Sequence, residues 1–171
     1  SHAHRAITLL SMGRTEDANP SIQKVRSMHP QPDGIEHWIR QNGKAMRMVF
    51  LGKQQEGKTP ATAADFEARA QYRFTLKRYD DASADLEEAL NLDPSSGPKG
   101  LFSLLVVVSE KRKDWKAKLA AARRWAETAP QAPEALNAHA WELLTNQDEK
   151  LRDPKAALPL ALKAAELTQN A

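Results

Sequence analysis

Apolar residues between Phe66 and Pro94 recur every three or four positions, which is the period of an amphipathic helix and not of a strand. The recurring positions are Phe66, Ala70, Phe74 and Leu76 in a first stretch, and Tyr79, Ala82, Leu86, Ala89 and Leu90 in a second. The polar dipeptide Lys77-Arg78 separates the two stretches. Asp93-Pro94 ends the second, because proline pushes the residue before it away from helical geometry. This segment therefore predicts two helices joined by a short turn.

The same pattern recurs in three other parts of the chain. Its positions there are Leu9, Leu10, Gly13, Ala18, Ile22, Val25 and Pro30; Phe102, Val106, Trp115, Ala122, Trp125 and Pro130; and Leu136, Ala140, Leu143, Leu144, Ala157, Leu160, Ala164 and Leu167. The last copy carries about five extra residues, NQDEK, between its helices. The predicted helices span residues 2–12, 15–28, 61–92 (two helices), 99–112, 115–129, 133–146 and 153–169. The β-branched run LLVVV at residues 104–108 is assigned to a helix because of its place in the repeat.

Residues 33–62 interrupt the period. They predict one inserted helix or degenerate repeat, with a helix over roughly residues 35–51 in which Trp38 packs. Gly43 would weaken this helix by about 1 kcal/mol relative to alanine. Ser95 to Pro98 is predicted to be a linker, and Asp153-Pro154 a cap followed by proline at the first helical position.

The repeated segment resembles the tetratricopeptide repeat (TPR), and specifically TPR proteins of the bacterial type. The residues that carry the resemblance are Ala70, Tyr79, Ala82, Leu86, Ala89 and Pro94. It implies an all-α fold, a right-handed superhelical α-solenoid of helix-turn-helix repeats. The whole chain, 1–171, would form a single TPR-like domain with repeats at about 1–32, 63–96, 99–132 and 133–170. One helix pair cannot bury its apolar face alone, so the repeats are expected to stack.

The resemblance also implies a non-catalytic scaffold whose first helices line a concave groove for a peptide or a partner's helix. The groove positions carried over onto this chain are Glu67, Gln71, Phe74, Ser103, Val107, Glu110, Asn137, Trp141 and Leu144. Phe74 and Trp141 are the candidate anchors, because buried aromatic residues commonly carry most of the interface energy. The alternative is that both aromatic side chains pack inside the repeats.

Charge is distributed in blocks, although the net charge is only +3. Residues 1–62 carry +4, 63–97 carry −4, 98–130 carry +5 and 131–171 carry −2. Such blocks fit attraction between adjacent repeats, or a patterned partner surface, and not a continuous nucleic-acid-binding stripe. The cluster Lys111-Arg112-Lys113, with Lys116 and Lys118, is either a solvated surface or a contact for an acidic partner. The longest apolar run, Leu101 to Val108 with one serine, is too short to span a bilayer, so no membrane insertion is expected.

Residues Gly52 to Thr59 fit G-x-x-x-x-G-K-[ST], the phosphate-binding loop pattern, in which Lys58 would contact phosphates and Thr59 magnesium. However, Pro60 follows directly, and repeats rather than a parallel sheet flank the segment. The other interpretation is a polar linker whose Thr59 caps the next helix, with Pro60 at its first position.

The remaining candidate chemistry is sparse. The chain has no cysteine, no H-E-x-x-H and no G-x-S-x-G, and His139 is interpreted as packed or surface-exposed and not as a metal ligand. We therefore expect no enzymatic activity, no cofactor and no metal site. A second hypothesis is an accessory segment of a larger multidomain enzyme or receptor, since Ala-Trp-x-Leu-Leu and Arg-Asp-Pro resemble long bacterial proteins of that kind. The last helix keeps an apolar stripe, Leu158, Leu162 and Ala165, with Leu151 as a further candidate. Three explanations are open: the natural chain continues there, another molecule packs on the stripe (a second copy, in a homo-oligomer, being one case), or the stripe folds wholly onto the preceding pair.

Overall fold

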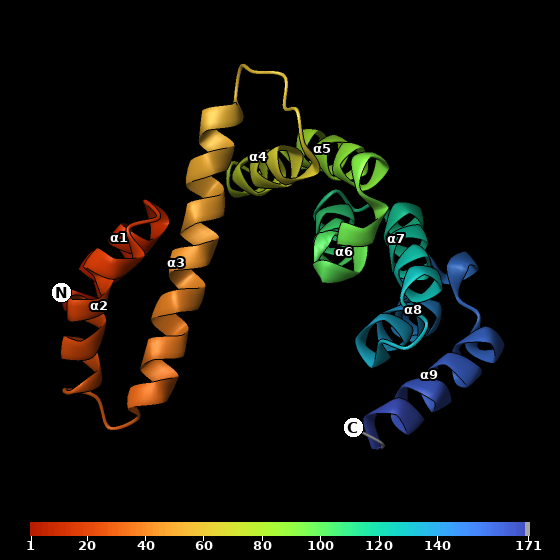
Figure 1. Ribbon diagram of the computed structural model, residues 1–171. Helices are drawn as coiled ribbons and strands as arrows, with labels where there is room; N and C mark the ends of the chain where they lie inside the picture. Colours follow the sequence, from red (N-terminus) through yellow and green to blue (C-terminus); the bar gives the residue numbers. More distant parts are fainter. Residues whose placement is uncertain (170–171) are drawn as a thin grey trace. The chain divides into compact units, whose positions relative to one another are not determined.

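Helices make up all the regular secondary structure of the described chain, so the all-α class predicted from the sequence is confirmed. The computed structural model (Figure 1) describes residues 1–169, apart from the side chains of Ser96, Pro98 and Lys99. The α-helices are α1 His2–Ser11, α2 Thr15–Arg26, α3 Pro32–Gln55, α4 Ala63–Thr75, α5 Tyr79–Leu92, α6 Leu101–Lys111, α7 Trp115–Thr128, α8 Pro133–Thr145 and α9 Pro154–Gln169. Two 3₁₀ helices, η1 Pro94–Lys99 and η2 Glu149–Leu151, complete them. The chain divides into two units, Ser1–Leu76 and residues 77 onward.

The first unit is built on the long helix α3. Its 24 residues extend over about 36 Å. Helices α1 and α2 pack on one half of α3, around the fully buried residues Ala6, Ala18, Ile22 and Ile39, and α4 packs along the other half (Figure 1). Apolar residues at helical spacing thus give α3 a contact surface for two different neighbours.

Glycines allow these close contacts. A Cβ atom added at Gly43 would lie only 2.5 Å from Cβ of Leu10 in α1, and one added at Gly52 would overlap the carbonyl oxygen of Ala68 in α4. The backbone of α3 therefore approaches α1 and α4 more closely than any side chain would permit. The sequence interpretation of Gly43 as only a weakness of the helix was incomplete for this reason.

The inserted helix is longer than predicted, spanning Pro32–Gln55 and not roughly 35–51. The expectation that Trp38 packs in this segment is wrong, because its side chain is 51% exposed. The predicted cap at Thr59 is also wrong. Helix α4 begins after Thr62, whose hydroxyl oxygen accepts a hydrogen bond from the backbone N–H of Asp65 at 3.2 Å. The Asp65 carboxylate accepts in return from the backbone N–H of Thr62 at 3.1 Å, which completes a capping box.

In the second unit, each helix packs against the helix that follows it in the chain. Small residues let the backbones come close: Ala82, Ala89, Ala122 and Ala157 are fully buried, and Leu86, Leu101 and Leu105 fill the space between helices. The LLVVV run lies within α6, as predicted. The predicted linker at 95–98 instead belongs to the 3₁₀ helix η1. Asp153 caps α9 as predicted, since its Oδ1 accepts hydrogen bonds from the backbone N–H groups of Lys155 and Ala156 at 3.1 and 3.0 Å.

Three inter-helix turns share one backbone feature. The residue after the C-cap has a positive φ in each: 77° at Gly13, 60° at Lys77 and 58° at Lys113. In the first and third, the next N–H closes a 6→1 hydrogen bond, from Arg14 to the Leu9 carbonyl at 2.9 Å and from Asp114 to the Ser109 carbonyl at 3.0 Å. The sequence repeat therefore corresponds to a repeated local conformation.

Ion pairs join the oppositely charged blocks of the second unit. Arg112 pairs with Asp80 at 2.7 Å, and Arg124 contacts both carboxylate oxygens of Glu87 at 3.0 and 2.8 Å. Both pairs link the basic block 98–130 to the acidic block before it, as the alternating charges suggested. These pairs are partly exposed, so each contributes little more than about 1 kcal/mol.

Candidate partner-binding surface

The groove candidates of the first unit lie on α4 and are half-buried. Nε2 of Gln71 donates a hydrogen bond to Oε1 of Glu67 at 3.2 Å, so two of the candidates bind each other. Burial raises the pKa of Glu67, although the hydrogen bond from Gln71 and the charge of Lys44 oppose this shift. Phe74 is half-buried and has an interaction partner of its own. Two of the three groove candidates on α4 are therefore engaged with each other.

The candidates of the second unit lie on α6 and α8, each set at i, i+4, i+7 spacing and therefore on one face of its helix. On α6 these are Ser103, Val107 and Glu110, and on α8 they are Asn137, Trp141 and Leu144. Val107, Trp141 and Leu144 have exposed fractions of 42%, 59% and 44%, although all three are large apolar residues. Ser103 is half-buried, and its hydroxyl donates to the Gly100 carbonyl at 2.7 Å. Asn137 is exposed at the rim of a hollow of about 600 Å³ between α8 and α9.

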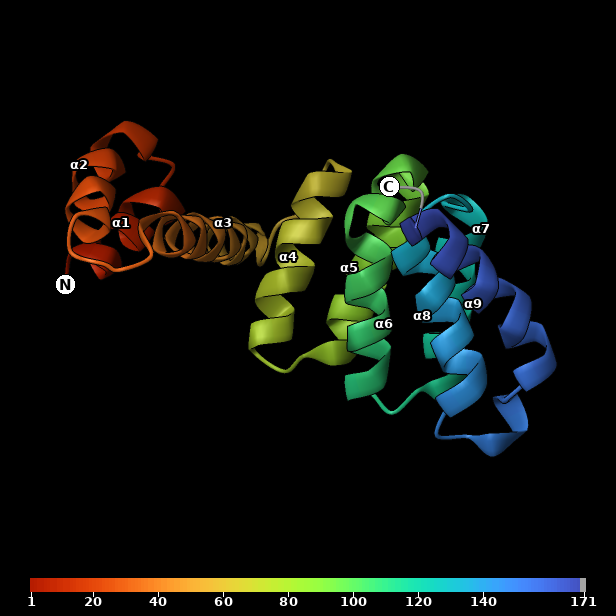
Figure 2. The same cartoon turned by 90° about the horizontal axis from the view of Figure 1, so that it is seen from below.

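One lysine of α7 forms ion pairs with both α6 and α8. Nζ of Lys118, on α7, lies 2.8 Å from Oε2 of Glu110 on α6 and 2.9 Å from Oε1 of Glu142 on α8. The C-terminal halves of α6 and α8 therefore both contact the same lysine, and the two helices lie next to each other in the view of Figure 2. We call the exposed residues Val107, Glu110, Trp141 and Leu144 the α6–α8 face.

The charges in this cluster stabilise one another. The hydrogen bond from Lys118, together with its positive charge, lowers the pKa of Glu110. Burial acts to lower the pKa of Lys118, but its hydrogen bonds to Glu110 and Glu142 outweigh this effect, so the pKa is raised. The lysine and the Glu110 carboxylate thus stay ionised at neutral pH. Glu142 was not among the sequence candidates, and Lys118 was considered only as part of the basic cluster with Lys111, Arg112, Lys113 and Lys116. Its pairing within the chain was not predicted, because that pairing depends on three helices meeting.

Asn146, at the end of α8, fixes the chain beyond the helix. Its Nδ2 donates to the carbonyl of Trp115 on α7 at 3.1 Å and to Oε2 of Glu142 at 3.4 Å. Its own backbone carbonyl accepts a hydrogen bond from Nε of Arg152 at 2.8 Å. The side chain is almost completely buried. The inserted NQDEK segment, which begins with this asparagine, was the only signal in the sequence that could have indicated such a role.

The segment that matches the phosphate-binding pattern has a different geometry. Gly52 to Gln55 form the end of α3, so their N–H groups face along a helix and not into a phosphate-binding loop. The Glu56 carboxylate pairs with Arg73 at 2.6 Å, and the Lys58 carbonyl accepts a hydrogen bond from Arg69 at 2.9 Å. The close contact of Gly52 with Ala68 gives a packing reason for the first glycine of the pattern.

The remaining candidate features of the described chain give weaker indications of a binding site. Within residues 1–169 no group of three His, Asp or Glu side chains is placed to hold a metal ion. His139 is half-buried beside a mostly apolar hollow between α7, α8 and α9, where burial, and secondarily Arg123, lower its pKa.

Leu158 and Leu162 of the end stripe are exposed on α9. Among the helices of the described chain, none has the length and hydropathy needed to cross a bilayer.

The comparisons with known proteins add no relative. No protein-family model matches this chain, and neither a curated protein nor a solved structure matches it.

Proposed function

We propose that this chain is a TPR-like α-solenoid and acts as a non-catalytic scaffold that binds a helix or peptide of a partner protein on its α6–α8 face. The solenoid interpretation is supported by the turns with positive φ at Gly13, Lys77 and Lys113. It is also supported by the complete burial of Ala70, Ala82, Leu86 and Ala89, the small and bulky positions of the TPR pattern. These residues carry the resemblance, and their burial supports the proposal because stacked repeats need small and bulky residues between their helices.

The observation that carries the binding proposal is the exposure of Trp141. The residue is 59% exposed, with Leu144 on the next turn of α8 and Val107 on α6. Tryptophan is among the residues that most often dominate interface energies, because its large apolar surface gains most from burial. The Lys118 ion pairs fix the spacing of α6 and α8, so the face is held in place before a partner binds.

The charges around this face indicate the partner's chemistry. Glu110 remains about half exposed while it pairs with Lys118. It can therefore accept a second hydrogen bond from a cationic side chain. The best fit is a segment with two apolar residues one helical turn apart and a lysine or arginine beside them.

The experiment uses two exposed tryptophans as a matched pair. Peptides are selected on the wild-type chain from a random display library, and their affinities are then measured for Trp141→Ala and for Trp38→Ala. Trp38 is also about half exposed but lies on α3. Loss of a central tryptophan is expected to weaken binding by about 2 kcal/mol, or roughly thirtyfold. Trp38→Ala should bind as the wild type does.

Two outcomes would contradict the proposal. One is a set of selected peptides that bind Trp141→Ala as tightly as the wild type. The other is an equal loss of affinity in Trp38→Ala, which would indicate general adhesion to exposed aromatic residues. Helical circular dichroism of both variants controls for misfolding.

A further inference from the structure

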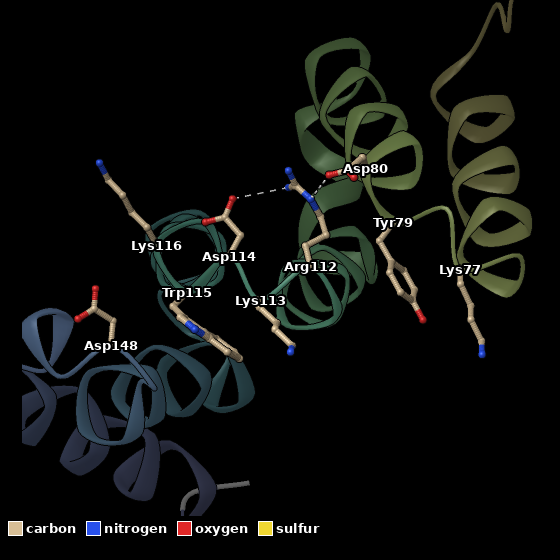
Figure 3. A pocket seen from close by; sticks show the side chains of 9 residues that line it. All are labelled: Lys77, Tyr79, Asp80, Arg112, Lys113, Asp114, Trp115, Lys116 and Asp148. Carbon is tan, nitrogen blue, oxygen red and sulfur yellow. Dashed lines mark hydrogen bonds and ion pairs between the residues drawn. The ribbon is translucent and has the colours of Figure 1, made fainter.

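A second surface of the same unit has a different chemistry. A depression of about 520 Å³ lies where the start of α5, the turn between α6 and α7, and the loop before η2 come together (Figure 3). Its volume falls within the range of ligand-binding clefts. No residue of the α6–α8 face lines it, so a ligand here would bind independently of the proposed partner.

The depression is built from a repeated tripeptide, lysine-x-aromatic. Lys77-Arg78-Tyr79 and Lys113-Asp114-Trp115 occupy equivalent places in their turns, with the aromatic residue at the first position of α5 or α7. In each turn the lysine has a positive φ, a conformation that non-glycine residues adopt at a cost of about 1 kcal/mol or more. The equivalent position of the first turn is Gly13. Lysine thus occupies two positions at which glycine would be less strained. Together with the place of both lysines in the depression, this strain indicates that their side chains contribute to binding.

The lysines are available to a ligand. Figure 3 shows the side chains of Lys77, Tyr79 and Lys113 extending in the same direction from their turns. Among the described residues, no ion pair involves Lys77, Lys113 or Lys116. Arg112, in contrast, is held by Asp80 at 2.7 Å and approaches Asp114 at 3.8 Å. Two of the acidic groups of the depression are therefore engaged by arginine, and the ammonium groups are left unpaired.

We propose that this depression binds a short acidic peptide segment. Carboxylates of the segment pair with Lys77 and Lys113. An aliphatic side chain between them packs on Tyr79, and another beyond Lys113 packs on Trp115. The three aspartates that line the depression, Asp80, Asp114 and Asp148, disfavour a dense polyanion. A nucleic-acid strand carries a charge on every nucleotide and would face these aspartates along its length. The alternation of ammonium and aromatic groups fits a segment in which acidic and aliphatic residues alternate.

The test is a fluorescence anisotropy titration at low ionic strength with a fluorescein-labelled hexapeptide of sequence Asp-Leu-Glu-Leu-Asp-Leu. The control peptide has asparagine and glutamine in place of the acids. The key variant is Lys77→Asn with Lys113→Asn, since asparagine tolerates positive φ and the turns are retained. The matched variant is Lys53→Gln with Lys155→Gln, which removes the same two charges from exposed positions elsewhere.

The expected results are at least tenfold weaker binding of the acidic peptide by the Lys77/Lys113 variant, an almost unchanged affinity in the matched variant, and weaker binding as salt rises. Equal losses in both variants would overturn the site, because net charge alone would then explain binding. Equal binding of the amide peptide would overturn the role of the lysines. A thymidine oligonucleotide that binds more tightly than the peptide and depends on the same lysines would overturn the choice of ligand.

Discussion

Nζ of Lys118 lies 2.9 Å from Oε1 of Glu142, and the glutamate side chain is 5% exposed where α7 meets α8. A carboxylate this deeply buried needs its partners, because water cannot replace them. Lys118 also pairs with Glu110, and Asn146 donates to the other oxygen of Glu142. The polar cluster of Lys118, Glu110, Glu142 and Asn146 thus lies at the centre of the packing of α6, α7 and α8. The exposed Trp141 lies beside it.

Substitution of Glu142 tests this cluster. We expect Glu142→Ala to lower the free energy of unfolding by about 3 kcal/mol, since Lys118 and Asn146 lose a buried partner. Urea denaturation followed by circular dichroism measures the change. The double variant Lys118→Met, Glu142→Leu should recover most of this loss, because apolar residues of similar size often replace a buried ion pair without penalty. A double variant as unstable as Glu142→Ala would show that the charges themselves are required.

His139 should make stability depend on pH. Burial and the charge of Arg123 lower its pKa below the ordinary value near 6.5, although Glu127 opposes the shift. The unfolded chain therefore binds a proton more readily than the folded one, and stability falls as the pH drops below about 6.5. We expect His139→Gln to lose less stability than the wild type between pH 7.5 and 5.5, as measured by thermal unfolding. The exposed His37→Gln is the matched control and should follow the wild type.

Two glycines of α3 should respond in opposite ways to alanine. Gly52→Ala is expected to destabilise the chain by about 2 kcal/mol, because the new methyl group would overlap the Ala68 carbonyl. Gly34 lies in the first turn of the same helix with no atom near its added Cβ. Gly34→Ala should therefore stabilise by about 0.5 kcal/mol through a better helix propensity. Equal effects at both positions in urea unfolding would contradict the close contact between α3 and α4.

The capping box of α4 can be tested against the threonine that the sequence favoured. Thr62→Ala removes the acceptor for the Asp65 N–H and should cost about 1 kcal/mol. Thr59→Ala should change the free energy of unfolding by only a few tenths, because Thr59 lies outside the helix. A larger loss at Thr59 than at Thr62 would place the start of the helix earlier.

The helices could be predicted from the sequence because their apolar positions recur at a fixed spacing, and Asp93-Pro94 and Asp153-Pro154 marked two boundaries correctly. The prediction was wrong where tertiary contacts decide. The length of α3 and the use of Gly43 and Gly52 follow from the neighbours that pack there, and no local pattern encodes these neighbours. Thr59-Pro60 and Thr62 both resemble caps, and only the reciprocal bond from Asp65 distinguishes them.

The candidate surface was predictable to a similar degree. The register of the repeat identified Val107, Trp141 and Leu144, which the structure places at exposed positions of α6 and α8. The register did not indicate that Glu110 would be paired within the chain, or that Glu142 and Asn146 would be buried. The pairing of Glu110 depends on Lys118, and the burial of Asn146 depends on Trp115. Both partners belong to α7, a helix that the groove pattern does not include.

The sequential packing of α5 to α9 has a consequence for how this unit forms. Contacts between chain neighbours need only short loops to close, so the entropic barrier to folding is low and the rate should be high. The same arrangement limits cooperativity, since each interface depends mainly on the two helices that share it. Amide hydrogens of α9 should then exchange before those of α7, which has a partner on either side. Helix α7, in the middle of the series α5 to α9, would be the last part of this unit to unfold.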